Sequence, residues 1–301
     1  MDGTAVIVAG ATGNLGGRIV RALLERGAQV RALVRQSVPT EKLEWLRNLG
    51  AVVFPADWGD ASQLRAACSG TACVVSALQG LRDVIVEAQG KLLEAAVRAG
   101  VPRFIPSDFS LDFTKLTPGE NRNFDLRREF HGRLERVEVS ATTIFNGAFA
   151  ELLLGAMPLV LFKYKLVLYW GDPDQRLDFT TIDDTAAFTA CAALDPQAPR
   201  FLRIAGDRLS ARELAALATD VTGRAFGLRR AGSLETLDRL IKLMRRIVAG
   251  KDRVYPIWQQ MQYMRNMFDG RAKLEPLDNG RYPGIRWTKV RDLLVARTAV
   301  H

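Results

Sequence analysis

The chain has 301 residues, of which 48% are apolar and 25% charged, an ordinary composition for a globular protein with one large domain or two lobes. It contains no apolar run long enough to span a membrane, and the first ten residues do not resemble a secretory signal. The three cysteines lack the spacing of metal ligands. We therefore expect a cytoplasmic protein with reduced, buried thiols, no metal site and no membrane partner.

The formal net charge is +9, which can indicate binding to nucleic acid or to another anionic surface. The arginines are scattered, however, and no DNA-binding motif accompanies them, so nucleic-acid binding is the weakest of the functional alternatives. The densest basic stretch, residues 239–253, has apolar residues at helical spacing and is interpreted as a helix with a solvated basic face. The positive charge would also attract a polyanionic cofactor.

Short β-branched runs alternate with amphipathic helical segments through the first 150 residues. The runs predict strands over residues 4–10, 28–35, 51–56, 71–78, 102–107 and 141–146. Between them, helices are predicted over residues 14–26, 41–49, 83–99 and about 117–136, with one more beginning after residue 60. This alternation predicts an α/β fold, a Rossmann-type doubly wound parallel sheet with right-handed crossovers.

Two of these helices carry capping signals at their start. Asp60 is expected to cap one helix with Gln63 three residues on, as in a capping box. Thr117, Pro118 and Glu120 occupy the N-cap, N1 and N3 positions of the other predicted helix.

The regular alternation ends after Phe149. Two strands are expected around a turn at residues 171–173, followed by a helix over 186–194 and a strand over 201–206. Ser210 and Glu213 form a second capping box, which opens a helix to about residue 222, and the chain from Ser233 onward is mostly helical. We predict a nucleotide-binding domain over residues 1–150 and a smaller, mainly helical substrate lobe over 151–301, with some segments returning to the sheet.

The glycine-rich stretch IVAGATGNLGG, residues 7–17, lies between the first predicted strand and helix. Gly10, Gly13 and Gly16 permit a tight turn and a close approach of the backbone to a pyrophosphate, which the helix N-terminus can bind. The alternative, a tight turn without a ligand, is less favoured because the strand–loop–helix context is present. The predicted pyrophosphate contacts are Gly10, Thr12, Gly13, Asn14, Leu15 and Gly16.

Arg35 ends the second predicted strand, where a site specific for NAD normally has an acidic residue for the ribose hydroxyls. A guanidinium instead suits a 2′-phosphate, and Lys42 at the start of the next helix can add a second positive charge. We therefore expect NADP(H) in preference to NAD(H). A plain surface arginine at a strand end is the alternative.

Further cofactor contacts are expected where the later strands end, because ligands bind at the carboxyl edge of such sheets. These positions are Asp57, Trp58, Ser76, Ala77, Leu78, Pro106, Ser107, Asp108, Asn146 and Gly147.

These motifs together resemble the NmrA-like, isoflavone-reductase-like branch of the atypical short-chain dehydrogenases/reductases. The resemblance rests on GATGNLG, VRQS, RFIPSDFS and ATTIFNGAFAELLL, with DFTTIDDTA and QYMRNMFDG in the second half. It implies an NADPH-dependent reductase, or one of the family's NAD(P)-sensing regulators, which act through a protein partner without turnover.

The chain departs from the related enzymes at two points. None of the five tyrosines has lysine four residues on, so the Tyr-x-x-x-Lys mechanism is absent. Isoflavone-reductase-like enzymes instead place a lysine on the helix before the sixth strand, and alignment puts Arg127 there. Arginine is not a general base, but it can stabilise negative charge, and His131 one turn on can donate a proton. The alternative is that Arg127 and His131 form an exposed pair on the helix.

The leading hypothesis is hydride transfer from NADPH to a hydrophobic aromatic or conjugated small molecule, in a cleft between the lobes. A catalytically inactive NAD(P)-sensing regulatory protein is the alternative, and the oligomeric state is open. The candidate walls of the substrate pocket also fit plain core, and they are Phe109, Phe149, Trp170, Trp258, Met261 and Met264.

Overall fold

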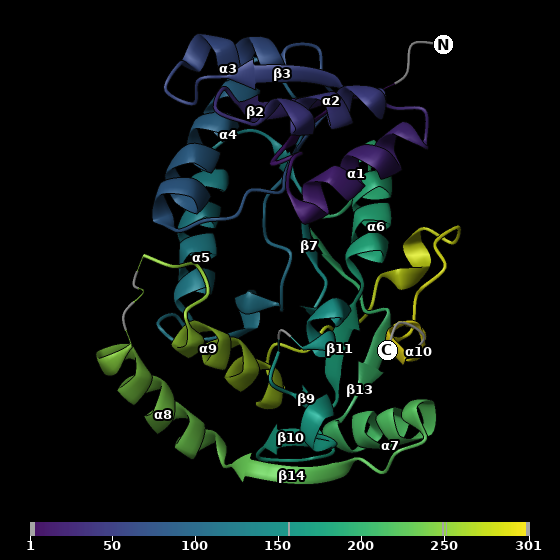
Figure 1. Cartoon of the computed structure of the whole chain (residues 1–301). Coiled ribbons are helices and arrows are strands. Elements are labelled where there is room, and N and C mark those ends of the chain that lie inside the picture. Colours follow the sequence, from purple (N-terminus) through teal and green to yellow (C-terminus); the bar gives the residue numbers. More distant parts are fainter. Residues whose placement is uncertain (1–3, 156, 249, 251, 299–301) are drawn as a thin grey trace. The chain divides into compact units, whose positions relative to one another are not determined.

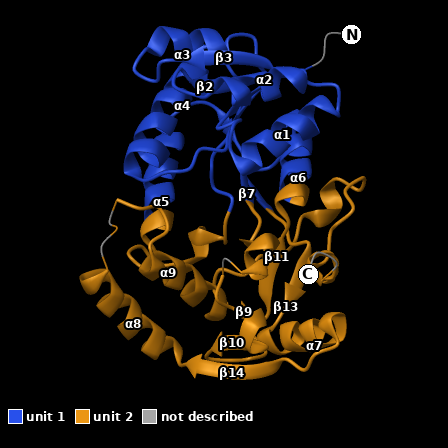
Figure 2. Cartoon of the chain, in the orientation of Figure 1, with its two compact units in different colours: residues 1–109, 125–144, 185–202 blue, residues 110–124, 145–184, 203–301 orange. Residues whose placement is uncertain are grey.

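The computed structural model describes residues 4–155, 157–248, 250 and 252–298 (Figure 1). The chain divides into two compact units, each made of several segments (Figure 2). Unit 1 consists of residues 1–109, 125–144 and 185–202, and unit 2 consists of residues 110–124, 145–184 and 203–301. Residues 185–202 thus belong with the N-terminal part of the chain. The predicted division at residue 150 stays a prediction.

Unit 1 contains a six-stranded parallel sheet in the order β3-β2-β1-β4-β5-β6. Its strands are β1 (Ala5–Ala9), β2 (Gln29–Arg35), β3 (Val52–Ala56), β4 (Cys73–Ser76), β5 (Arg103–Ile105) and β6 (Ser140–Ala141). The order reverses between β1 and β4, which is the point where doubly wound sheets bind ligands. The predicted α/β fold class is confirmed.

Helices of unit 1 follow the strands as crossovers. They are α1 (Asn14–Leu24), α2 (Thr40–Asn48), α3 (Ala61–Cys68), α4 (Gln89–Arg98), most of α5 (Arg122–Leu134) and most of α6 (Ile182–Leu194). Side chains from α3, α4 and α5 pack with one face of the sheet around the fully buried Ile7, Val74 and Phe104. The helices cover this face with apolar side chains, whereas polar residues such as Ser76, Ser107 and Asp108 lie at the carboxyl ends of the strands. We call these strand ends the polar edge of the unit.

Unit 2 contains smaller sheets and the remaining helices. One sheet has the order β14-β10-β9 and another the order β13-β11-β8. The strands of these sheets are β8 (Ala148–Phe149), β9 (Val160–Leu161), β10 (Leu166–Trp170), β11 (Leu177–Thr180), β13 (Asp207–Leu209) and β14 (Gly227–Gly232). Strands β7 (Thr143–Phe145) and β12 (Phe201–Arg203) pair with each other, and two of the three residues of each belong to unit 1. The helices are α7 (Ala211–Thr222), α8 (Leu234–Ile247), α9 (Ile257–Phe268) and α10 (Val290–Thr298).

The predicted start of α5 at Thr117 is wrong. Gly119 has φ +90°, a left-handed conformation that interrupts a right-handed helix, and α5 begins only at Arg122. The side-chain oxygen of Asn121 accepts hydrogen bonds from the backbone N–H groups of Asn123 (3.1 Å) and Phe124 (3.4 Å). Asn121 therefore caps the helix, a role for which asparagine is well suited.

Other local predictions hold with small changes. The Asp60 cap is confirmed, but Gln63 bonds the backbone N–H of Asp57 and the Asp60 carboxylate, so the reciprocal contact differs from a capping box. The predicted helix over 83–99 begins with a π-helical turn, η1 (Asp83–Ala88). Cys68 and Cys73 are buried, whereas Cys191 is only partly buried, which corrects the expectation for that thiol.

The capping box of α7 is complete, because Ser210 and Glu213 bond each other's backbone N–H groups. We expect Ser210→Ala to lower the free energy of unfolding by about 1 kcal/mol, since it leaves a helix N–H without its acceptor. Urea unfolding followed by circular dichroism measures this. Ser37→Ala, at an exposed turn position, is the control and should change little. Equal losses in both variants would contradict the capping role.

Candidate functional site

The turn between β1 and α1 is built from backbone in close contact. Gly10 has φ +81°, and a Cβ at this position would lie 2.6 Å from the carbonyl oxygen of Ala77. A Cβ on Gly16 would overlap the carbonyl oxygen of Gly10. Neither position has space for a side chain, so the loop lies directly against the end of β4 and against the first turn of α1.

The loop leaves the N-terminus of α1 open to a ligand. Gly13 is the N-cap residue and offers no side-chain acceptor to the first turn, whose N–H groups lack intrahelical partners. These donors and the helix dipole suit an anion. Asn14 is exposed, and Thr12 and Leu15 are partly exposed, so the turn is accessible. The cradle therefore fits the pyrophosphate of a dinucleotide.

Two further residues of this region were not singled out from the sequence. Arg18 donates hydrogen bonds to the backbone carbonyl and side chain of Asn14, which places a guanidinium beside the first turn of α1. A Cβ on Gly17 would lie 2.6 Å from the Trp45 ring of α2, so this glycine allows α1 and α2 to pack closely. In the sequence, the two consecutive glycines at 16 and 17 were the feature that could have indicated this close packing.

The carboxyl ends of β4 and β5 meet beside this loop. Ala77 donates its backbone N–H to Ala9 (2.8 Å), and the Ser107 hydroxyl donates to the carbonyl oxygen of Leu78 (2.6 Å). Ser76 is fully buried, and its Oγ has no hydrogen-bond partner within the part of the chain that the structure describes. Pro106 precedes Ser107 and is also buried. The predicted contacts from β1, β4 and β5 therefore lie at one edge of the sheet.

Gln89 joins the π-helical turn to this edge. Its side chain is fully buried, its amide donates to the carbonyl oxygen of Ile85 (3.0 Å), and its Oε1 accepts from the backbone N–H of Ser107 (2.9 Å). The side-chain amide thus bonds a carbonyl inside the irregular turn and fixes the strand end at the same time. A lone glutamine on an otherwise apolar helix face was the signal for this residue.

The outer strands carry the residues expected near the adenosine. Arg35 at the end of β2 and Lys42 in α2 are exposed, and among the described residues no hydrogen bond or ion pair engages either side chain. Asp57 accepts from the backbone N–H of Gly59 (2.8 Å). Trp58 packs against the apolar core, and its indole N–H lacks a partner in the described ranges. Two free cations therefore lie in the region of β2 and α2.

The last two predicted cofactor residues belong to unit 2. Asn146 and Gly147 both donate their backbone N–H groups to the carbonyl oxygen of Ser110, at 3.0 and 3.1 Å. Asn146 is fully buried, and neither end of its side-chain amide has a partner among the described residues. A Cβ on Gly147 would overlap the carbonyl oxygen of Asp178.

A buried polar network surrounds Asp108 at the end of β5. Its Oδ2 accepts from the Thr143 hydroxyl (2.8 Å) and lies 2.6 Å from His131 Nε2. Arg200 donates to the Thr143 hydroxyl (2.7 Å) and lies 3.3 Å from His131 Nδ1. Because arginine only donates, Nδ1 is the acceptor in the Arg200 contact, and Nε2 carries the proton that faces Asp108. Both ring nitrogens of His131 are thus engaged by buried groups.

The same surroundings determine the charge of Asp108. Burial alone would raise the pKa of this carboxyl, but His131, Arg127 and the Thr143 hydroxyl together hold the pKa below its usual value. Asp108 is therefore a buried carboxylate, stabilised by its neighbours at neutral pH.

Arg127 and His131 are not an exposed pair, since 9% and 7% of their surfaces are accessible. The exposed pair on the helix, given above as the alternative, is therefore wrong, because the His131 ring lies among Asp108, Thr143 and Arg200. Arg127 donates its Nε proton to the carbonyl oxygen of Ser107 (3.1 Å). Both residues thus contact the end of β5, but through different groups.

The six predicted pocket walls are distributed over both units. Phe109 lies in unit 1 and Phe149 in unit 2, and each is partly exposed. Trp170 is buried with its ring centroid 5.9 Å from that of Phe268. Trp258, Met261 and Met264 are buried on α9, so they fill the interior of unit 2 in the structure described.

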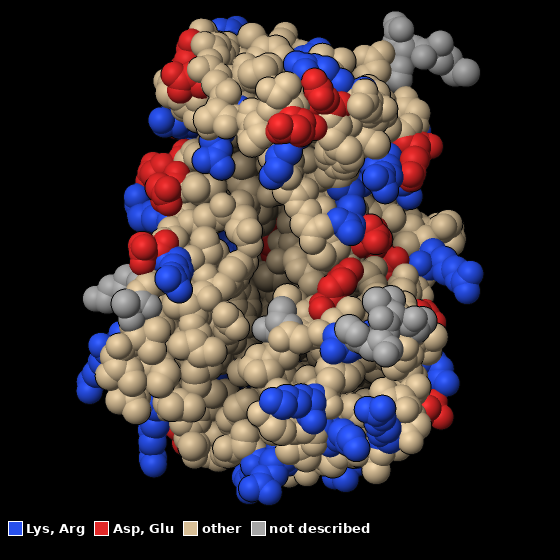
Figure 3. Space-filling view, viewed as in Figure 1, with Lys and Arg blue, Asp and Glu red and all other residues tan. Residues whose placement is uncertain are grey.

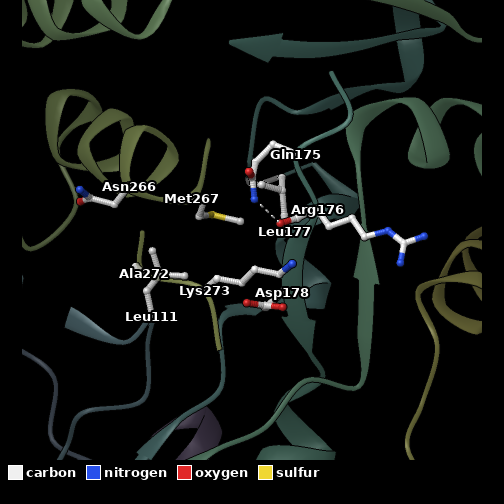
Figure 4. A pocket seen from close by; sticks show the side chains of 9 residues that line it. All are labelled: Leu111, Gln175, Arg176, Leu177, Asp178, Asn266, Met267, Ala272 and Lys273. Carbon is white, nitrogen blue, oxygen red and sulfur yellow. Dashed lines mark hydrogen bonds between the residues drawn. The ribbon is translucent and has the colours of Figure 1, made fainter. Parts of the chain in front are cut away.

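One small pocket of unit 2 lies between β11 and the segment after α9 (Figure 4). Its volume of about 10 Å³ is close to that of a single water site. Asp178 and Lys273 face each other on one side of it, and Gln175 lies on another (Figure 4). None of the six predicted wall residues lines this pocket, and it is too small for an aromatic substrate.

The chain belongs to the NmrA-like family, whose model matches residues 2–289. This confirms the resemblance inferred from the motifs. Among the described residues, no group of side chains has the arrangement of a metal site, and no helix has the length and apolar character needed to cross a bilayer.

Pinoresinol reductase 1 of Arabidopsis thaliana is 32% identical over 208 residues, which are 64% of this chain and 66% of that protein. The solved structure of AtPrR2 with NADP+ and (+)pinoresinol is 23% identical, with a TM-score of 0.83 over 98% of this chain and 99% of that chain. The NADPH-dependent quinone oxidoreductase QOR2 of Escherichia coli, complexed with NADPH, is 20% identical, with a TM-score of 0.77 over 97% and 99%. The structural likeness establishes the fold.

We expect Gly16→Ala to weaken NADPH binding at least about tenfold, because the added methyl group displaces the backbone that would contact the pyrophosphate. Fluorescence titration of the purified protein measures the affinity. Gly284→Ala is the matched control, since its Cβ meets open space and its φ is unstrained. Unchanged affinity in Gly16→Ala would show that the loop does not hold the cofactor.

Asp108→Asn should lower the free energy of unfolding at neutral pH by about 1–3 kcal/mol, because it breaks a buried hydrogen-bond network. The folded-state pKa of Asp108 is depressed, so its stabilising contribution is present above about pH 4, the usual aspartate pKa, and is lost as the pH falls through the folded-state value. Urea unfolding at several pH values tests this difference. Asp174→Asn, at an exposed ion pair with Arg212, should change little.

Proposed function

We propose that this protein is an NADPH-dependent reductase that transfers hydride to a hydrophobic aromatic or conjugated small molecule. The observation that carries the proposal is the glycine cradle at the switch point of a doubly wound sheet, which has no space for a side chain at Gly10 or Gly16. The names of the relatives support the substrate class, since they are a pinoresinol reductase and a quinone oxidoreductase.

In this proposal the cofactor binds along the carboxyl edge of unit 1. The first turn of α1 would hold the pyrophosphate, and Arg35 with Lys42 would bind the 2′-phosphate of NADP(H), because both cations are exposed and have no partner among the described residues. When bound, NADPH supplies a hydride, and the acceptor must also gain one proton. Ser76, Ser107 and the neighbouring strand ends would orient the nicotinamide.

The proposed role of Arg127 is electrostatic. Its Nε is held by the Ser107 carbonyl oxygen, which fixes a permanent positive charge beside the end of β5. A guanidinium at that place stabilises negative charge that develops on a substrate oxygen as hydride arrives.

His131 was expected to be a proton donor, and its geometry favours a different proposal. With Nδ1 facing Arg200 and Nε2 facing Asp108, the imidazole is better suited to position the Asp108 carboxylate than to meet a substrate directly. We propose His131 as a positioning residue and water as the proton source. We retain Trp258 and Met261 as proposed walls of the substrate pocket.

The second candidate function is an NAD(P)-sensing regulator that acts through a protein partner. The feature that favours it is Arg127, which stands where the family resemblance implies a lysine and whose Nε donates to the carbonyl oxygen of Ser107. Such a protein would bind oxidised and reduced cofactor unequally and would show no turnover.

The test is oxidation of NADPH followed by absorbance with a panel of quinones, enones, aromatic ketones and furofuran lignans such as (+)pinoresinol. We expect acceptor-dependent consumption of NADPH by the native protein. Arg35→Ala should raise KM for NADPH by about tenfold to a hundredfold and leave that for NADH unchanged, since it removes charged hydrogen bonds to the 2′-phosphate.

Arg21→Ala, an exposed arginine of α1, is the control for the loss of charge and should keep the native KM. Absence of turnover across the panel, together with tighter binding of NADP+ than of NADPH, would reject the reductase in favour of the sensor. An equal loss with both cofactors in Arg35→Ala would reject the phosphate contact.

A further inference from the structure

Helix α8 carries an unusual concentration of exposed apolar side chains. Ten large apolar residues are exposed in the described part of the chain, and five of these lie between residues 240 and 257, so the exposure is concentrated in one region. Leu240, Leu243 and Ile247 have 39%, 50% and 63% of their surfaces accessible. Their spacing of three and four residues aligns them in one row along the helix.

This row lies beside the side of α8 that packs into unit 2. Leu237 and Ile241 are the buried residues of the helix, and they lie about 60° and about 100° around the helix from Leu240. The helix packs against α9, where Ile257 is also exposed next to the loop that follows α8. Unit 2 therefore buries one edge of the apolar face of α8 and leaves the other edge in solvent.

Basic residues border the exposed row. Arg239, Lys242 and Arg246 are exposed on its outer side, and residues 239–247 contain no acidic residue. Asp238, the last acidic residue before them, is paired with Arg265 of α9 (3.1 Å). In Figure 3 the surface over α8 is mostly tan with blue at its outer edge. We call this surface the α8 face, meaning Leu240, Leu243 and Ile247 with Arg239, Lys242 and Arg246.

The charge of the α8 face selects its partner. Two copies of the face would bring their basic residues together, and the chain as a whole has 42 basic and 33 acidic residues, so a second copy is disfavoured. An anionic partner is favoured instead. The apolar row needs an environment that excludes water, since contiguous exposed apolar surface usually marks an interaction site.

The shape of the α8 face favours a lipid surface over an acidic protein. The residues lie on the outer side of a single helix, and such a ridge needs a complementary groove in a protein partner, whereas a lipid interface deforms around it. An amphipathic helix with basic residues beside a leucine-rich stripe lies in the plane of an interface. The long arginine and lysine side chains reach the phosphate groups while the leucines enter the acyl boundary.

We propose that the α8 face docks the protein peripherally on anionic lipid membranes. Leu240, Leu243 and Ile247 insert at the interface, and Arg239, Lys242 and Arg246 bind the headgroup phosphates. The expectation of no membrane partner, made from the sequence, considered only segments that span a membrane. The structure adds the observation that the apolar row is exposed to solvent. This inference does not depend on the reductase proposal.

The experiment is co-sedimentation of the full-length protein with vesicles of phosphatidylcholine alone or with about 30% phosphatidylglycerol. We expect binding only to the anionic vesicles, and its loss when salt rises from about 0.05 M to about 0.5 M. The double variant Leu243→Ser/Ile247→Ser should lower the partition coefficient about tenfold or more. The triple variant Arg239→Gln/Lys242→Gln/Arg246→Gln should lower it roughly a hundredfold.

Matched controls test whether any loss of charge or apolar surface suffices. Val52→Ser removes an equally exposed apolar residue from β3, and Arg65→Gln/Arg98→Gln/Arg136→Gln removes three exposed charges from unit 1. Both should bind like the native protein. Circular dichroism and the thermal midpoint of each variant confirm that it is folded, which is expected because all these side chains are exposed.

Three results would overturn the proposal. Absence of native binding to anionic vesicles at low salt would exclude a lipid partner, and equal binding by the α8 variants and the controls would exclude the α8 face. Light scattering that shows a native dimer, converted to a monomer by Leu243→Ser/Ile247→Ser, would assign the face to a second copy.

Discussion

The contact between the backbone at Gly16 and the carbonyl oxygen of Gly10 is the constraint on which unit 1 depends. It brings the start of α1 against the end of β1. Gly10, in the left-handed conformation, makes the turn between them and lies in close contact with the carbonyl oxygen of Ala77. Any side chain at either position would separate α1 from the sheet. Because β1 is a central strand, this tight turn fixes the direction of the α1 dipole. It also determines which strand ends surround the N-terminus of α1.

A second layer of organisation joins those strand ends to the helices. Ser107 is held at its backbone N–H by Gln89, at its hydroxyl by Leu78 and at its carbonyl by Arg127. Asp108, the next residue, is held by His131 and Thr143. Two adjacent residues therefore receive hydrogen bonds from α4, α5 and β7, which fix this part of the polar edge although it lies in a loop. Such support is what a site needs if it is to orient a cofactor.

The features that sequence could predict are those encoded locally. The alternation of strands and helices, the glycine turn and the Ser210–Glu213 capping box each depend on residues a few positions apart, and these predictions agree with the structure. The start of α5 shows the limit of such reasoning. Thr117, Pro118 and Glu120 have the right identities for a helix start, but the left-handed Gly119 and the cap provided by Asn121 move the helix to Arg122.

The candidate site was harder to predict because its contacts are long-range. Arg200 reaches His131 across 69 positions of sequence, and no local pattern indicates that pairing or the burial of the histidine that results. The exposed row of α8 was hidden for a similar reason. Leu240 and Ile241 are both apolar, and only the packing of unit 2 decides that one faces solvent and the other the interior.

The division of the chain into two interleaved units has a consequence for biosynthesis. The polypeptide passes between the units five times, and unit 1 is complete only when residues 185–202 have been made. The last strand-flanking helix, α6, must therefore emerge from the ribosome before the N-terminal sheet is fully covered. Neither unit can be excised as one continuous fragment, and a nonsense mutation before residue 202 would leave both units incomplete.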